Sequence, residues 1–221
     1  MSGTSAEGAP TEARTGDAGP AGASAAGVEV PPAAETVARA RAALAGRPLV
    51  LVGLMGVGKT TIGRMVAQYL DLPFFDADEA IEEASRMTIP DIFERFGEEE
   101  FRRLERRVVA RLLDDGPMVL ATGGGAFVNG ETRAAIRDGA RTVWLRAELD
   151  VLVERTARRK NKRPLLRDGD PRAILKRLME ERHPIYAEAD LVVESERQRR
   201  EAVASKLVHA LAGAASTGPA P

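Results

Sequence analysis

The chain has 221 residues, no cysteine, two histidines and a formal net charge of −1. This balanced charge provides no overall basic field that would attract nucleic acid. The absence of cysteine excludes disulfides and thiolate zinc sites and is typical of a cytoplasmic protein. No apolar run in the sequence approaches the length needed to cross a bilayer. We therefore expect a cytoplasmic protein that binds neither nucleic acid nor membranes.

The two ends of the chain differ in composition from the middle. Residues 1–35 contain almost no large apolar side chain, so they cannot bury enough surface to offset the entropy that is lost on ordering. The next eleven residues, 36–46, could form a short helix that leads into the domain. We expect a disordered extension over residues 1–46, one folded domain over residues 47–212 and a disordered tail over residues 213–221.

Within residues 47–212, short apolar runs alternate with segments of helical periodicity. Strands that alternate with helices indicate a parallel sheet covered by helices on both faces. The predicted strands are residues 48–52, 72–75, 118–121, 142–145 and 191–193. The predicted helices are residues 61–70, 78–86, 89–96, 98–113, 130–138, 149–158, 171–187 and 197–212, and residues 159–170 form a charged loop.

Residues 53–60 read GLMGVGKT and fit the phosphate-loop pattern G-x-x-x-x-G-K-[ST]. The motif stands between a predicted strand and a predicted helix, which is the context it requires. Its glycines allow a tight turn close to a polyphosphate, and the helix N-terminus offers unpaired N–H groups to anionic oxygens. Lys59 can reach the β- and γ-phosphates, and the Thr60 hydroxyl can bind Mg²⁺. The alternative is an ordinary glycine-rich turn, but the full pattern in this setting predicts a nucleoside triphosphate site.

Further polar residues follow two other predicted strands. Asp76 and Asp78 follow the strand at residues 72–75, and the Gly123–Gly125 turn follows the strand at residues 118–121. In parallel sheets, ligands bind beyond the carboxyl ends of the strands, where the phosphate loop also lies. Either aspartate could instead cap the following helix. The glycines could form a plain turn, although three in succession indicate close approach of a ligand to the backbone.

Arginines supply the remaining features. Arg102 lies in the charged segment EEEFRRLERR, which usually forms a solvated helix face with i,i+4 ion pairs. The basic run at residues 155–163 could be a nucleic-acid patch, but it has no interleaved aromatic side chains for stacking. Its late position favours a lid whose arginine contacts phosphates. The run RQRR at residues 197–200 could be no more than the solvated start of a helix.

Taken together, these features resemble the shikimate kinase family. The resemblance extends from residue 48 to residue 211, and the N-terminal extension has no counterpart in the family pattern. Besides the phosphate loop, the family patterns D-x-D, F-R-x-x-E, G-G-G, R-P-L-L and R-x-P-x-Y occur in order as Asp76–Asp78, Phe101–Glu105, Gly123–Gly125, Arg163–Leu166 and Arg182–Tyr186.

The resemblance implies a three-layer α/β/α fold with a five-stranded parallel sheet. This is the nucleoside monophosphate kinase-like class of P-loop NTPases, with a mobile lid over residues 159–170. The implied reaction transfers the γ-phosphoryl group of MgATP to the 3-hydroxyl of shikimate and gives 3-phosphoshikimate and ADP. It is a step in the biosynthesis of chorismate and the aromatic amino acids, and the resemblance implies a monomeric cytoplasmic enzyme.

The resemblance also assigns roles to individual residues. A planar guanidinium suits the carboxylate of shikimate because it can donate two parallel hydrogen bonds. The implied catalytic residues are Lys59, Asp78 and Arg163, and the implied shikimate ligands are Asp78, Arg102, Gly124 and Arg182. ATP is assigned to Gly56, Val57, Gly58, Lys59, Thr60, Thr61 and Arg163, with Arg155 and Gln198 at the adenine, and Mg²⁺ to Thr60 and Asp76.

Two other functions fit parts of the pattern. Another small-molecule kinase of this fold, such as a gluconate kinase, would share the phosphate loop and lid but would not need the arginine pair for a carboxylate. An ATP-binding regulatory module on a reused kinase scaffold is the second alternative. Such a module would be expected to lack Lys59, Asp78 or Arg163, and all three residues are present.

Overall fold

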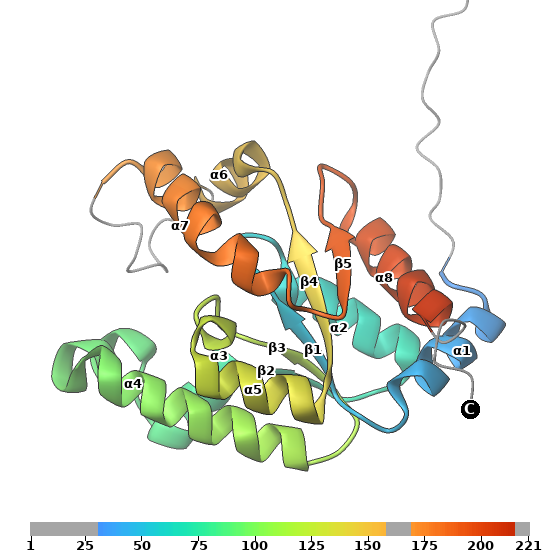
Figure 1. Cartoon of the computed structure of the whole chain (residues 1–221), viewed down its shortest axis with the longest axis horizontal. Coiled ribbons are helices and arrows are strands. Elements are labelled where there is room, and N and C mark those ends of the chain that lie inside the picture. Colours follow the sequence, from blue (N-terminus) through green and yellow to red (C-terminus); the bar gives the residue numbers. More distant parts are fainter. Residues whose placement is uncertain (1–30, 158–168, 215–221) are drawn as a thin grey trace, which may run out of the picture.

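The computed structural model describes residues 31–157 and 169–214 (Figure 1). Its centre is a five-stranded sheet of order β2-β3-β1-β4-β5, and every neighbouring pair of strands is parallel. The five-stranded parallel sheet predicted from the sequence is thereby confirmed. The strands are β1 (Leu49–Val52), β2 (Phe74–Asp76), β3 (Val119–Ala121), β4 (Arg141–Arg146) and β5 (Leu191–Glu194).

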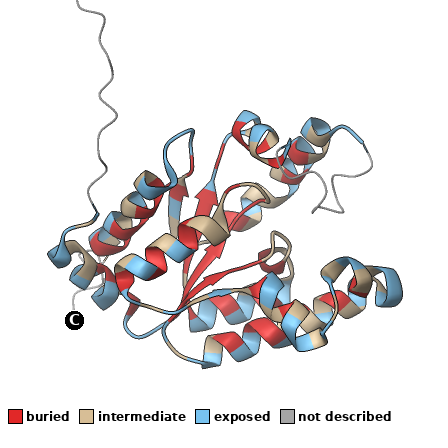
Figure 2. Ribbon diagram, turned by 180° about the vertical axis from the view of Figure 1, so that it is seen from behind, coloured by how far each residue is buried: buried red, intermediate tan, exposed pale blue. Residues whose placement is uncertain are grey.

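The central strand β1 consists only of leucine and valine, and all four residues are buried. A continuous apolar run is expected for a parallel strand that has helices over both of its faces. In register, Val50 lies beside Leu120 of β3 and Thr142 of β4. Figure 2 shows the buried residues concentrated on the strands and on the helix faces turned toward them. The phosphate loop therefore starts from the most enclosed strand of the molecule.

Helices cover both faces of the sheet (Figure 1). Helices α1, α2 and α8 lie on one face, α4 and α5 lie on the other, and α6 and α7 stand beyond the ends toward which the strands run. In the described ranges, no helix is both long and apolar enough to cross a membrane. The helices are α1 (Ala34–Leu44), α2 (Lys59–Leu70), α3 (Ala77–Ser85), α4 (Ile89–Asp114), α5 (Gly130–Gly139), α6 (Leu149–Ala157), α7 (Pro171–Tyr186) and α8 (Arg200–Ala214), with a 3₁₀ turn η1 (Ala126–Val128).

Helix α4 contains the break that the sequence predicted between residues 89–96 and 98–113. Gly97 has φ 80° and ψ 177°, a conformation outside the helical range that other residues rarely adopt. The preceding residue, Phe96, is exposed, whereas Phe93 and Phe101 on either side of the break pack with ring centroids 4.6 Å apart. The break therefore lets two helical segments join at an angle while keeping one shared aromatic contact.

The N-terminal boundary of the folded body lies before residue 47. Residues 34–44 form α1, which packs against α8 and buries Ala40 and Leu44 completely or nearly so. The short helix expected over residues 36–46 is therefore present as α1, and the disordered extension expected over residues 1–46 is wrong for this helix, whose alanines and leucine pack against α8. Helix α8 likewise runs to Ala214, two residues into the expected tail. Residues 1–30 and 215–221 lie outside the described residues.

If α1 belongs to the folded body, shortening its buried leucine should destabilise the whole domain. Leu44→Ala is expected to lower the free energy of unfolding by about 2–5 kcal/mol, because it leaves a cavity in the core. Arg41→Ala is the matched control, since among the described residues Arg41 makes only an exposed ion pair, with Asp71 at 3.5 Å. That change should cost less than about 1 kcal/mol. Denaturant titration of both variants measures the difference, and equal stability would show that α1 is not part of the core.

Candidate active site

The phosphate loop connects β1 to α2 and wraps over the N-terminus of α2. Gly53 has φ 135°, and a Cβ atom there would lie 2.4 Å from the carbonyl oxygen of Leu145 in β4. Gly56 and Gly58 have φ 87° and 105°, and Gly58 directly precedes α2. The first glycine is thus required by packing against the sheet, and the other two by the turn itself. The resulting loop presents backbone N–H groups and a helix N-terminus, which together favour an anion.

Lys59 lies folded back over the loop. Its Nζ donates hydrogen bonds to the carbonyl oxygens of Gly53 at 2.7 Å and Leu54 at 3.1 Å. The ammonium is therefore held at the start of the loop, above the N-terminus of α2. A phosphate bound on the loop would meet this charge at close range.

Thr60 and Asp76, the two residues assigned to Mg²⁺, are in direct contact. The Thr60 hydroxyl donates to Asp76 Oδ2 at 2.7 Å, and Asp76 Oδ1 accepts from the backbone N–H of Asp78 at 3.0 Å. Asp76 therefore does cap α3, as the alternative interpretation held, but its second oxygen faces the phosphate loop. In the described part of the chain, no cluster of three acidic, histidine or cysteine side chains could hold a metal. The pair suits Mg²⁺, which usually keeps water and phosphate oxygens among its ligands.

Asp78 lies at the start of α3, open to water on the side of the cleft. The pKa of its carboxyl is raised to about 6, mainly by partial desolvation and then by the negative charge of Asp76, while Lys59 acts in the opposite direction. Asp78 therefore changes its charge in the range just below neutral pH. A carboxyl of this kind can accept a proton from an alcohol more readily than an ordinary aspartate.

The turn after β3 allows several side chains to approach its backbone. A Cβ atom on Gly123 would lie 2.8 Å from Asp78 Oδ1 and 3.2 Å from Glu105 Oε1. A Cβ atom on Gly125 would lie 2.7 Å from both terminal nitrogens of Arg102. These distances are shorter than or at the limit of real carbon contacts, so a side chain at Gly123 or Gly125 would displace the Asp78 carboxylate or the Arg102 guanidinium. The turn thus lets charged side chains of the protein itself come close to its backbone, and the close approach of a ligand stays a prediction.

Arg102 is held in place by two carboxylates of its own helix. Its Nη1 donates to Glu105 Oε2 at 2.7 Å, and its Nε and Nη2 donate to Glu98 Oε1 at 3.3 and 3.1 Å. Glu105 is 1% exposed, and its other oxygen, Oε1, is buried with no hydrogen-bond partner in the described residues. Burial raises the pKa of Glu105, although Arg102 opposes this. The i,i+4 ion pair of the alternative interpretation is therefore present between Glu98 and Arg102, but the guanidinium is half-buried and oriented by two carboxylates.

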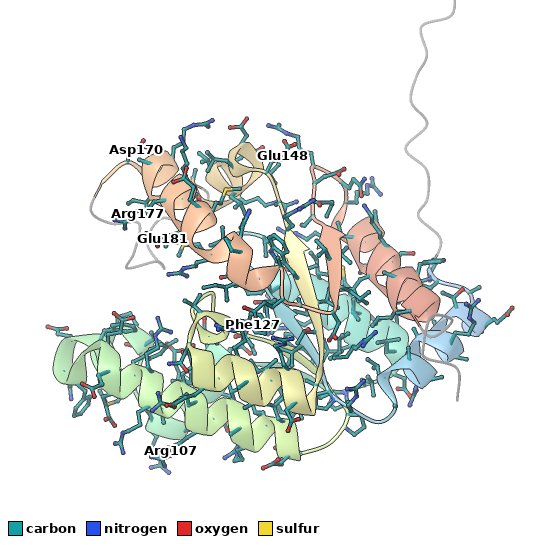
Figure 3. The ribbon with its side chains drawn as sticks, in the orientation of Figure 1. Arg107, Phe127, Glu148, Asp170, Arg177 and Glu181 are labelled. Carbon is teal, nitrogen blue, oxygen red and sulfur yellow. The ribbon has the colours of Figure 1, made fainter. Side chains whose placement is uncertain are left out.

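Helix α7 adds a second arginine on the other side of the same turn. Arg182 Nη1 and the Tyr186 hydroxyl both donate to the carbonyl oxygen of Gly124, at 2.9 and 2.5 Å. Burial raises the pKa of Tyr186 to about 12, so the phenol remains a hydrogen-bond donor. Phe127, labelled in Figure 3 between α5 and α7, stacks on Tyr186 with ring centroids 6.5 Å apart. Aromatic packing therefore fixes the position of α7 over the glycine turn.

Arg155 connects three segments at the opposite side of the phosphate loop. Its Nη1 donates to the carbonyl oxygen of Val57 at 3.1 Å and to Ser195 Oγ at 2.9 Å, and its Nη2 donates to the carbonyl oxygen of Glu196 at 2.6 Å. Ser195 Oγ also donates to Val57 at 2.9 Å. Helix α6, the phosphate loop and the segment after β5 are thus held together by one guanidinium.

The phosphate loop, Asp76, Asp78, Gly123, Gly124 and Arg155 border a cleft of about 520 Å³ at the carboxyl ends of the strands. Arg102 and Arg182 approach the glycine turn beside it but are not among the residues that line this cleft. Its size and position are those of a small-molecule site in a parallel α/β protein. The structure does not bring Gln198 to this cleft: the side chain is exposed and donates to Glu196 at 3.3 Å. Arg163 and most of the expected lid lie outside the described residues. The cleft is lined by Met55–Thr60, Asp76, Asp78, Glu79, Glu82, Ile89, Pro90, Thr122–Gly124, Arg155 and Arg200.

Comparison with known proteins relates this arrangement to one family. The model of the shikimate kinase family matches residues 55–212. The chain belongs to the shikimate kinase family. It is 58% identical over 172 residues to a shikimate kinase from Brucella canis, covering 78% of this chain and 86% of that relative. It is 53% identical over 180 residues to a shikimate kinase from Mesorhizobium japonicum, covering 81% of this chain and 88% of that relative.

Solved structures of the family have the same fold. A shikimate kinase from Acinetobacter baumannii in complex with shikimate is 36% identical and superposes with a TM-score of 0.72. The match covers 76% of this chain and 94% of that chain. The nucleoside monophosphate kinase-like P-loop fold expected from the resemblance is confirmed.

Several residues of the site had no role in the sequence-based prediction. Glu105 was part of a motif but was not assigned a function, and its burial beside Arg102 could not be read from a segment so rich in charge. Tyr186 likewise belonged to a motif, R-x-P-x-Y, but was not assigned a function. Ser195 was given no role, and Arg200 was noted only within a run that could be a solvated helix start, because the positions of both depend on how the end of β5 meets the phosphate loop.

The raised pKa of Asp78 has a consequence for stability. A carboxyl whose pKa is about 6 in the folded state and an ordinary 3.8 in the unfolded chain contributes stability that is fully present below about pH 4. This contribution is lost as the pH rises through about 6. Asp78→Asn removes the ionised carboxylate, so the variant should melt at a higher temperature than the unchanged chain at pH 7.5. The difference should disappear near pH 4.

The exposed Asp138 on α5 provides the control for this measurement. Asp138→Asn should leave the melting temperature nearly unchanged at both pH values. Differential scanning calorimetry of the three proteins compares them directly. A lower melting temperature for Asp78→Asn at pH 7.5 would show that the cleft stabilises the ionised form of Asp78, and would contradict the raised pKa.

Proposed function

We propose that this chain transfers the γ-phosphoryl group of ATP to the 3-hydroxyl of shikimate and produces 3-phosphoshikimate and ADP. Its membership of the shikimate kinase family supports an ATP-dependent kinase with this reaction. The observation that carries the proposal is the glycine turn, which gathers the carboxylates of Asp78 and Glu105 and two arginines beside a phosphate loop. No such gathering is needed for nucleotide binding alone.

The acceptor binds through Asp78, Arg102, Gly124 and Arg182. Shikimate carries one carboxylate and three hydroxyls, so it needs cationic donors at one end and an acceptor of hydrogen bonds at the other. Arg102 and Arg182 border the turn from α4 and α7 and supply the donors. Asp78 lies on the side of the turn nearer the phosphate loop and accepts from the ring hydroxyls. This orientation places a hydroxyl toward the nucleotide.

Phosphoryl transfer depends on in-line positioning and on neutralisation of charge. The loop from Gly56 to Thr61 binds the phosphates, and Lys59 exchanges its two carbonyl partners for phosphate oxygens. The Thr60 hydroxyl and the Asp76 carboxylate would hold Mg²⁺, which would supply positive charge to the phosphates of the nucleotide. Asp78 orients the attacking hydroxyl and receives its proton, because its pKa of about 6 leaves it ionised at neutral pH but more basic than an ordinary aspartate.

The remaining assignments stay predictions of the sequence. Arg163 acts on the transferring phosphoryl group from a lid over residues 159–170, and closure of this lid excludes water that would compete as acceptor. The expected monomeric state and cytoplasmic location belong to the same proposal.

A coupled assay that detects ADP tests the proposal against its nearest alternative. Shikimate and gluconate are offered side by side at equal concentration with MgATP. The proposal predicts rapid ADP formation with shikimate and a rate near the no-acceptor background with gluconate. Turnover of gluconate without turnover of shikimate would assign the chain to a different acceptor, and binding of ATP without turnover of either would favour a regulatory module.

The carboxylate contact is tested by Arg102→Lys. An ammonium cannot replace a planar fork that donates two hydrogen bonds, so shikimate binding should weaken by roughly 2–5 kcal/mol. ADP binding should stay the same, because Arg102 lies on the acceptor side of the cleft. Arg103→Lys is the matched control. Arg103 follows Arg102 in the chain, is exposed and, among the described residues, pairs only with Glu100. Calorimetric titration measures both ligands, and normal shikimate affinity in Arg102→Lys would contradict the proposed contact.

A further inference from the structure

The single tryptophan of the chain, Trp144 on β4, lies between the phosphate loop and α7. Its side chain is 4% exposed. The indole meets the ring of His183 edge-on, with ring centroids 4.9 Å apart, and its centroid lies 6.0 Å from that of Tyr186. A Cβ atom on Gly53 would lie 3.4 Å from Cδ1 of the indole. One side chain of the sheet thus approaches both the first glycine of the phosphate loop and the end of α7.

The last turn of α7 needs support from outside the helix. Pro184 lies inside α7 and has no backbone N–H, so it cannot donate the helical hydrogen bond to residue 180. Among its neighbours, α7 packs most closely against α6 and η1, and the space between its end and β4 is filled by side chains. The position of this turn therefore depends on what those side chains are.

The donors that fix the glycine turn lie on this part of α7. Arg182 directly precedes His183, and both Arg182 and Tyr186 donate to the carbonyl oxygen of Gly124. Gly124 in turn lies close to the phosphate loop, because a Cβ atom there would lie 3.6 Å from the backbone nitrogen of Met55. The distance between the end of α7 and β4 therefore determines where the Arg182 guanidinium lies relative to the phosphate loop.

The indole is itself held in a fixed orientation. The Arg146 guanidinium lies over its ring, 5.4 Å from the centroid, which is a favourable cation–π arrangement. Arg146 is oriented by Glu194 of β5, whose Oε1 accepts from its Nε at 2.6 Å. A leucine, which is one of the two residue types that fill β1, is smaller and has no aromatic face. It could not keep His183 and Tyr186 at their observed distances from the sheet.

We propose that Trp144 is a positioning residue for the phosphoryl acceptor. The indole holds the last turn of α7 at the distance from the phosphate loop at which Arg182 binds the acceptor carboxylate. This inference rests on the proposed kinase function, and it adds a residue of β4 that does not touch the acceptor itself. The phosphate loop remains held by β1 and by Arg155 when the indole is removed, so the effect falls on the acceptor and not on the nucleotide.

The test measures shikimate and ADP binding to Trp144→Leu and Trp144→Phe by calorimetry. Trp144→Leu should weaken shikimate binding about tenfold, because it removes the aromatic contacts to both His183 and Tyr186. Trp144→Phe keeps one ring but is shorter, so its shikimate affinity should lie between those of the leucine variant and the unchanged chain. ADP affinity should stay the same in all three proteins. If Trp144→Leu does not fold, the phenylalanine variant alone decides.

Two further variants separate positioning from a general loss of stability. Leu44→Ala truncates a buried side chain on α1 that does not line the cleft, so it should lower the melting temperature and leave shikimate affinity unchanged. Arg182→Ala combined with the tryptophan substitution should lose no more shikimate affinity than Arg182→Ala alone, because the indole acts through Arg182.

The outcomes distinguish this inference from the proposed function. If the unchanged chain binds ADP but not shikimate, the proposed acceptor is wrong. If it binds shikimate and the Trp144 variants bind it equally well, Trp144 does not position the acceptor site. Equal losses for ADP and shikimate, or an equal loss of shikimate affinity in Leu44→Ala, would indicate only a weakened fold. Additive losses with Arg182→Ala would show that Trp144 does not act through Arg182. Each of these last results overturns the proposed role of Trp144.

Discussion

The acceptor side of this cleft depends on the absence of side chains in the turn after β3. A single methyl group on Gly123 or Gly125 would overlap the carboxylate of Asp78 or the guanidinium of Arg102. The turn carries no charge of its own, yet it decides how closely groups from α3, α4 and α7 can approach one another. Arg182 and Tyr186 then fix it from above through the carbonyl oxygen of Gly124. The backbone of the three glycines thus contacts each of the side chains that are proposed to bind the acceptor.

Asp76 links this acceptor side to the phosphate side. One of its oxygens accepts from Thr60 in the first turn of α2, and the other caps α3 at the backbone of Asp78. Its negative charge also raises the pKa of Asp78, so a cation bound at Thr60 and Asp76 would lower that pKa. Binding of a cation beside the nucleotide would therefore change the pKa of the Asp78 carboxylate through Asp76 alone. Similarly, Arg155 connects the phosphate loop to the segment after β5 through hydrogen bonds to Val57 and Ser195. The segment after β5 and the residues around Asp76 are thus both bonded to the phosphate loop or to the first turn of α2.

The sequence was most informative where one local pattern required one local structure. The apolar run of β1, the phosphate loop and the break at Gly97 were all predictable, because each follows from side-chain size or backbone freedom over a few residues. Helix α1 was assigned to the disordered extension, because its alanines form a core contact only through packing against α8, which lies far away in the chain. Asp76 shows a further limit: helix capping and a functional role were treated as alternatives, whereas one carboxylate oxygen caps α3 and the other accepts from Thr60 at the phosphate loop. Glu105 and Arg200 could not be assigned, because their surroundings come from segments far away in the chain.

Gly125→Ala tests most directly whether the glycine turn positions the acceptor ligands. The added methyl group meets only the movable end of Arg102, so the fold should remain while the guanidinium is displaced. Shikimate affinity should fall by roughly 2–5 kcal/mol with ADP affinity unchanged, and Arg102→Ala combined with Gly125→Ala should lose no more than Arg102→Ala alone. Gly130→Ala, where an added methyl group meets nothing within 4 Å, serves as the control. Calorimetric binding of shikimate to Gly125→Ala at the affinity of the unchanged chain would contradict this account.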